Sequence, residues 1–281
     1  MIVQKSYTAS SKLYLVPTPI GNMQDMTYRA VEALRESDVI FCEDTRVTKV
    51  LLSHFAIQSD LRSYHIFNEN ERIDEILNLL RAGKTISLVS DAGMPCISDP
   101  GYLISVKAIE EGFACIALPG ANAGLTALVA SGLPTNQFFF FGFLDHKASQ
   151  KEKQLSKIKQ MTQTIIFYES PYRVLETLKI MHKVLGDRNV VVAREISKKF
   201  EEYTRGKLSE LIENPPMAKG EFVIIVSGAK EQEESLELNQ LSVEEHMKHY
   251  LDQGVDEKEA MRKVAKDRGV AKGEIYKIIK T

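Results

Sequence analysis

Residues 13–22 of the chain, LYLVPTPIGN, set the pattern on which its fold is built. The apolar run Leu13–Val16 predicts a short buried strand, which stops against two prolines and a glycine in the segment 17–22. Proline and glycine at this density exclude both a helix and a central strand. The stretch is therefore a strand with a loop at its carboxyl end.

The same alternation continues over residues 12–132. Apolar runs predict further strands at 39–42, 86–89 and 114–118, and helices are expected between them, as at 71–81. Strands that alternate with helices of this length favour a mainly parallel sheet covered on both faces. Residues 12–132 are thus predicted to form an α/β domain.

The pattern changes at a hinge around 132–135, which reads GLPT. Residues 135–228 mix strands and helices and predict an α+β domain, whereas 229–241, rich in Glu, Gln and Ser, predicts a linker. The last part, 242–281, predicts short helices with tight glycine turns, which resemble a helix-turn-helix arrangement. The start of the chain, 1–11, is expected to be a disordered lead-in.

Composition narrows the class of protein. The formal net charge of −2 over 281 residues excludes a uniformly basic nucleic-acid binder but leaves room for local basic patches. No apolar run reaches the roughly 20 residues that a membrane-spanning helix needs. The three cysteines, Cys42, Cys96 and Cys115, form no disulfide or metal-ligand pattern, which favours a reducing, cytoplasmic location. No set of metal ligands is visible.

Four loops of the first domain follow strands: 17–22, 43–46, 90–100 and 119–124. In open α/β sheets the carboxyl ends of the strands are the edge at which ligands bind. Three of the loops are rich in Gly, Pro and Ala, which let the backbone approach a ligand closely. The chain has neither a phosphate-binding GxxxxGK[ST] string nor a dinucleotide-binding GxGxxG after its first strand.

Several strings occur in one order and spacing: VPTPIGN at 16–22, EDTR at 43–46, SDAGMPCISDPG at 90–101, LPGA at 118–121, FYESPYR at 167–173, ARE-I-SK at 193–198 and GEFVIIV at 220–226. This set closely resembles the tetrapyrrole methylase superfamily, and within it the branch that methylates small-subunit ribosomal RNA. The resemblance covers residues 12–228 and extends to the helical C-terminal part. It implies two α/β domains with the cofactor cleft between them, plus the small C-terminal helical unit.

The resemblance also implies the chemistry. It predicts a homodimeric, S-adenosylmethionine-dependent enzyme that methylates the ribose 2′-hydroxyl of a cytidine in the decoding region of 16S ribosomal RNA. The residues that would contact the cofactor on this pattern are Pro17, Asp91, Ala92, Gly93, Ser98, Asp99, Pro119, Gly120, Ala121, Glu169, Ala193, Glu221 and Phe222. The chain departs from the family at Met94, where threonine is usual, and at Asp145-His146, where proline and a small or basic residue are usual.

Methyl transfer to a ribose hydroxyl requires in-line alignment of three atoms and a group that accepts the hydroxyl proton or a cation that polarises the hydroxyl. The charged residues at strand ends give a short list for this role: Glu43, Glu195 and Lys198. The same charged groups are equally compatible with salt bridges that hold loops in place. His65 is better explained as a hydrogen-bonded loop residue than as a base.

RNA contacts are expected from local positive charge. Residues 146–160 carry five lysines and one glutamate, and 262–281 carry seven basic and two acidic residues. Such charge contacts phosphates without reading bases, although a lysine-rich helix can also be merely a solvated face. The predicted RNA contacts are Arg46, Lys147, Lys151, Lys153, Arg173, Lys263, Lys266 and Lys272.

Two other functions fit part of this pattern. One is methylation of a small tetrapyrrole by an enzyme of the same superfamily, a substrate that needs neither the lysine-rich helix nor the basic tail. The other is a non-catalytic RNA-binding protein on this fold, against which the three intact ligand loops argue.

Overall fold

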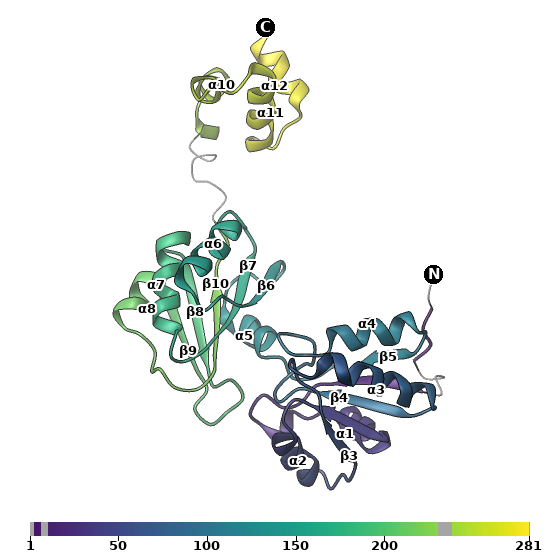
Figure 1. Cartoon of the computed structure of the whole chain (residues 1–281). Helices are drawn as coiled ribbons and strands as arrows, with labels where there is room; N and C mark the ends of the chain where they lie inside the picture. Colours follow the sequence, from purple (N-terminus) through teal and green to yellow (C-terminus); the bar gives the residue numbers. More distant parts are fainter. Residues whose placement is uncertain (1–2, 7–10, 230–237, 281) are drawn as a thin grey trace. The chain divides into compact units, whose positions relative to one another are not determined.

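The computed structural model describes residues 3–6, 11–229 and 238–280. Most of the expected lead-in, residues 7–10 included, and residues 230–237 of the expected linker lie outside these ranges. The chain divides into two compact units, one formed by 1–157 with 164–227 and the other by 158–163 with 228–281. Figure 1 shows the elements of each.

The first sheet of the larger unit is parallel throughout, in the order β3-β2-β4-β1-β5. Helices α1 and α2 pack on one of its faces and α3 and α4 on the other, because side chains alternate along each strand. The elements are β1 (Lys12–Val16), η1 (Met23–Asp25), α1 (Tyr28–Glu36), β2 (Val39–Cys42), α2 (Thr45–His54), β3 (Asp60–Ser63), α3 (Glu69–Arg81), β4 (Thr85–Val89), α4 (Tyr102–Glu110) and β5 (Ala114–Ala117).

The second sheet is mixed, in the order β6-β7-β10-β8-β9. Strand β10 runs antiparallel to β7 and β8, so it begins at the edge where they end, and Phe222 pairs with Glu169 on one side and Arg194 on the other. The elements are α5 (Ala123–Ser131), β6 (Phe138–Phe143), α6 (Ala148–Ile158), β7 (Thr164–Glu169), α7 (Val174–Leu185), β8 (Asn189–Arg194), β9 (Glu202–Lys207), α8 (Leu208–Glu213) and β10 (Phe222–Val226).

Helix α5 packs Ala127 and Leu128 into a core with Ile166 and Val223 of the second sheet. Its sequence, AGLTALVAS, is apolar almost all round and therefore lacks the periodicity that marks an amphipathic helix. For the same reason it was not predicted. Strand β3 was also not predicted, because its DLRS sequence is polar and it lies at the edge of the first sheet.

The smaller unit includes the helices α10 (Val243–Asp252), α11 (Glu257–Asp267) and α12 (Lys272–Ile279), and residues 238–240 are helical as well. Ser242 begins α10 with a capping box to Glu245, and Val243, Met247, Val264 and Ile275 share one apolar core. The predicted fold class, two α/β domains with a small C-terminal helical unit, is confirmed by the two sheets with their helices and by α10–α12. Within the described residues, no helix is long and apolar enough to cross a membrane.

Candidate active site

Loops after three neighbouring strands of the first sheet are bonded to one another. Thr18, after β1, exchanges two backbone hydrogen bonds with Gly93, after β4, at 2.9 and 3.0 Å. The buried Thr18 hydroxyl also donates to the carbonyl of Ser90 at 3.0 Å. The amide of Asp44, after β2, donates to Asp91 Oδ1 at 3.0 Å. The predicted ligand loops are therefore one connected surface at the carboxyl edge of the sheet.

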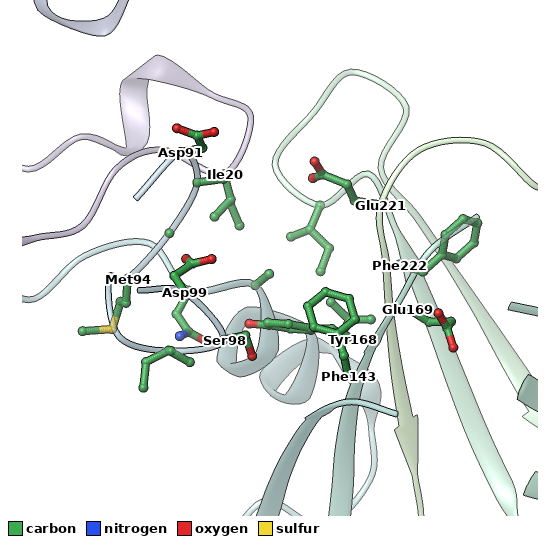
Figure 2. A pocket seen from close by; sticks show the side chains of 17 residues that line it. Ile20, Asp91, Met94, Ser98, Asp99, Phe143, Tyr168, Glu169, Glu221 and Phe222 are labelled. Carbon is green, nitrogen blue, oxygen red and sulfur yellow. The ribbon is translucent and has the colours of Figure 1, made fainter. Parts of the chain in front are cut away.

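These loops border a cavity of about 280 Å³, near the lower end of the range for small-molecule sites. Figure 2 shows Asp91 and Asp99 on its first-sheet side, and Glu221 and Phe222 on its second-sheet side. Of the predicted cofactor contacts, those lining it are Asp91, Ala92, Gly93, Ser98, Asp99, Glu169, Glu221 and Phe222. The lining residues that were not predicted are Ile20, Met94, Ile97, Asn122, Ala123, Phe143, Tyr168, Ile196 and Val223.

The other predicted cofactor contacts lie behind or beside this lining. Ala193 has no exposed surface and packs in the core beneath α5. Pro17 packs against Gly120, where an added Cβ would lie 2.5 Å from Pro17 Cβ. Pro119 and Ala121 flank that glycine, and none of these five residues lines the cavity. The close approach at Gly120 shows that this loop supports Pro17.

Carboxylates dominate the electrostatics of the first-sheet side. Burial raises the pKa of Asp99 to about 7, and the nearby charges of Glu43 and Asp91 act in the same direction. Burial likewise raises the pKa of Asp91 and of Glu43 above their ordinary values. A cationic ligand in the cavity would relieve this repulsion, because it favours the ionised form of each carboxyl.

Two loops that border the cavity contain backbone conformations unusual for residues with side chains. Cys96 and Ser98 have φ of 70° and 64°, and Glu195 and Ser197 have φ of 52° and 69°. Non-glycine residues in this region carry strain and are concentrated at functional sites. Gly142 makes room for the first loop, since an added Cβ would lie 3.0 Å from Ser98 Oγ.

The predicted catalytic residues Glu195 and Lys198 form an ion pair. Lys198 Nζ lies 2.9 Å from Glu195 Oε1 and 3.1 Å from Glu221 Oε2. Partial burial acts to lower the pKa of Lys198, but the bonds to these carboxylates outweigh it and the pKa is raised. The bond from Lys198 lowers the pKa of Glu195. Lys198 therefore stays protonated and cannot accept a proton, although it can supply positive charge.

Glycine at position 21 lets the loop after β1 meet the second-sheet loop. An added Cβ there would lie 2.4 Å from Lys198 Cγ, and φ is +145°. Asp25, in η1, also bonds the hydroxyl of Ser197. Together these contacts fasten the two sides of the cavity to each other next to Glu221, which lines it.

The predicted RNA contacts differ in accessibility. Lys147, Lys153 and Lys266 are exposed, and the Arg46 side chain is 89% exposed although it pairs with Asp44. Arg173, Lys263 and Lys272 are half-buried. Lys151 has no exposed surface, so its prediction as an RNA contact is wrong: α6 turns this lysine toward the core instead of toward solvent.

The two departures from the family pattern have distinct environments. Met94 lines the cavity, where its thioether adds apolar surface. Asp145 accepts the amide hydrogen of Lys147 at 2.8 Å and its own amide donates to Gln154 at 2.9 Å. Asp145 therefore organises the entry to α6, which is a local structural role.

The residues that line the cavity fit S-adenosylmethionine, the cofactor that the sequence resemblance implies. Asp91 and Asp99 offer negative charge to a sulfonium, and Ile20 and Ile97 offer apolar surface to an adenosine. Glycine at position 93 keeps the loop backbone accessible from the cavity, because it adds no side chain there.

Comparison with known proteins agrees with this geometry. The family model described as Tetrapyrrole (Corrin/Porphyrin) Methylases matches residues 12–212. The ribosomal RNA small subunit methyltransferase I of Halalkalibacterium halodurans is 48% identical over 99% of both chains. Its Bacillus subtilis counterpart is 47% identical over 94% of this chain and 92% of that protein. Uroporphyrin-III-C-methyltransferase from Thermus thermophilus shares the fold, with a TM-score of 0.56, 15% identity, and coverage of 78% of this chain and 92% of that one.

Proposed function

Because the chain belongs to the tetrapyrrole methylase family, we propose that it transfers the methyl group of S-adenosylmethionine to the 2′-hydroxyl of a cytidine in the decoding region of 16S ribosomal RNA. The assignment of S-adenosylmethionine as the methyl donor is supported by the cavity, which combines the carboxylates of Asp91 and Asp99 with apolar lining residues. The RNA substrate is supported by the names of the relatives that match over nearly the whole chain.

In this proposal the cavity residues hold the cofactor. Asp91 and Asp99 balance its positive charge, and Ile20 with Ile97 covers the adenosine. When bound, S-adenosylmethionine supplies an electrophilic methyl group on a sulfonium. The loops that the Thr18–Gly93 bridge fastens together keep these side chains in fixed positions, which lowers the entropic cost of aligning the reacting groups.

Of Glu43, Glu195 and Lys198, we assign the role of proton acceptor to Glu43. Its raised pKa moves toward neutrality, where a general base is most effective, whereas Glu195 has a lowered pKa and Lys198 is protonated. Lys198 instead contributes positive charge beside the cavity. The exposed lysines Lys147 and Lys153 at α6 supply the phosphate contacts of this unit.

The proposal includes a homodimer in the cytoplasm. Leu125 and Val129 on α5 are 46% and 79% exposed, and Phe138 and Phe139 on the edge strand β6 are 43% and 36% exposed. Apolar surface of this kind is typical of a protein interface. The described cysteines are all free, which fits a reducing compartment in which ribosomes are assembled.

Cofactor binding is tested by isothermal titration calorimetry with S-adenosylmethionine. The double variant Asp91→Asn/Asp99→Asn should bind at least about tenfold more weakly, which corresponds to the loss of one favourable charge interaction. Asp252→Asn, on an exposed position of the smaller unit, is the matched control and should bind as the wild type does. Equal affinity of the double variant and the control would refute the assignment of the site.

A further inference from the structure

Lys151 is unusual because it is a fully buried lysine from the most lysine-rich part of the chain. Lysine is almost never fully buried unless its charge is paired. Its Nζ donates to Thr177 Oγ1, on α7, at 2.6 Å and lies 3.7 Å from Glu169 Oε2, at the end of β7. The buried positive charge is thus directed at one carboxylate.

Both oxygens of that carboxylate are engaged. Glu169 Oε2 accepts the Thr177 hydroxyl at 2.6 Å, and Oε1 accepts the amide of Ser170 at 2.7 Å. Glu169 Oε1 also forms an ion pair with Arg173, whose Nε lies 2.9 Å away. Glu169 lines the cavity, yet Figure 2 shows its carboxylate directed away from Asp91 and Asp99. A buried carboxylate with four such partners is fixed in place, and what it holds is the turn 170–173.

Arg173 is the exposed end of this chain of contacts. Its Nε forms an ion pair with Glu169 and donates its hydrogen to the Ser170 hydroxyl at 3.1 Å, and its side chain is 30% exposed. Because these contacts are made through Nε, they do not use the two terminal amino groups of the guanidinium. A guanidinium presented in this way suits a phosphate, which accepts two parallel hydrogen bonds.

We propose that Lys151, Thr177 and Glu169 form a buried relay that positions Arg173 to bind a phosphate of the substrate RNA beside the cavity. Lys151 is the positioning residue, because it compensates the buried charge of Glu169 and never touches the substrate. Removing the lysine would leave that carboxylate without its buried cation, so Glu169 would pull on Arg173 or turn toward solvent. The inference rests on the proposed RNA methyltransferase function.

A double-mutant cycle measured with assembled small ribosomal subunits tests the relay. Arg173→Ala should raise KM for the subunits about tenfold and reduce the slope of log KM against log salt by about one, as for the loss of one phosphate contact. Lys151→Met should also raise KM for the subunits and reduce the salt slope, and its affinity for S-adenosylmethionine should stay within about twofold of wild type. The Lys151→Met/Arg173→Ala double variant should be no worse than Arg173→Ala alone.

Lys179→Ala, an exposed lysine on α7 close to Thr177, is the matched control and should leave KM and the salt slope unchanged. If Lys151→Met does not fold, Thr177→Val, which removes the hydroxyl that links Lys151 to Glu169, takes its place in the same cycle, with the melting temperature checking the fold. Additive effects of the two changes, or an unchanged salt slope in the relay variants, would overturn the relay. A wild type that methylates no small subunits would instead overturn the proposed function, and the relay with it.

Discussion

Protonation of Asp99 makes cofactor affinity depend on pH in a predictable way. A carboxyl with a pKa of about 7 in the free protein attracts a sulfonium only in its ionised form. At pH 8 the ionised form predominates, whereas at pH 6 only about a tenth of the molecules carry it, since each unit below the pKa costs a factor of about ten. The affinity for S-adenosylmethionine should therefore fall about tenfold from pH 8 to pH 6, as the linkage of protonation and binding requires.

The assay is isothermal titration calorimetry at several pH values, with S-adenosylhomocysteine as the matched ligand. This product has the same adenosine and amino-acid parts but no sulfonium charge, so its affinity should change by less than about twofold, because no charge interaction is lost. Asp99→Asn should bind S-adenosylmethionine weakly at both pH values. Parallel pH profiles for the two ligands, or a wild-type profile retained in Asp99→Asn, would refute the role assigned to this carboxylate.

Three further changes probe the rest of the site. Gly21→Ala should lower the free energy of unfolding by more than Gly83→Ala does. Left-handed strain costs roughly 1–2 kcal/mol in Gly83→Ala, and only at position 21 would the new Cβ also meet Lys198. Thermal melting compares the two variants. Glu43→Gln should reduce methyl transfer at least about a hundredfold in a single-turnover assay while cofactor affinity stays close to wild type; full activity would remove Glu43 as the base. Lys272→Glu should weaken small-subunit binding several-fold at low salt and less at high salt, and a salt-independent loss would contradict a phosphate contact.

Much of the fold could be predicted from local sequence signals. The prolines and glycine after Val16 and the small residues at 90–100 marked strand ends, and in a parallel sheet strand ends meet at one edge. Strand β3 and helix α5 were not predicted because β3 is polar at all positions but Leu61, whereas α5 is apolar at most positions. Periodicity identifies only elements with one buried and one exposed face.

Side-chain direction limited what could be predicted of the site. Lys151 stands four residues before Leu155 and seven before Ile158, so the helical period places it on the buried face of α6, whereas Lys153 falls on the exposed face. A count of lysines treats both residues alike and therefore missed the difference. Pro17 and Gly120 are on the correct loops but pack on each other, a contact that depends on the tertiary arrangement of two loops. Ile20 and Tyr168 line the cavity although neither carries a signal of binding by itself.

If this chain methylates small-subunit ribosomal RNA, the methyl group of the cofactor must appear on that RNA. The direct measurement incubates the purified protein with S-adenosylmethionine labelled in its methyl group, and with either assembled small subunits or a porphyrin precursor. We expect label on the ribose of a decoding-region cytidine and none on the porphyrin precursor. Label on the porphyrin precursor, with the ribosomal RNA unlabelled, would contradict this expectation.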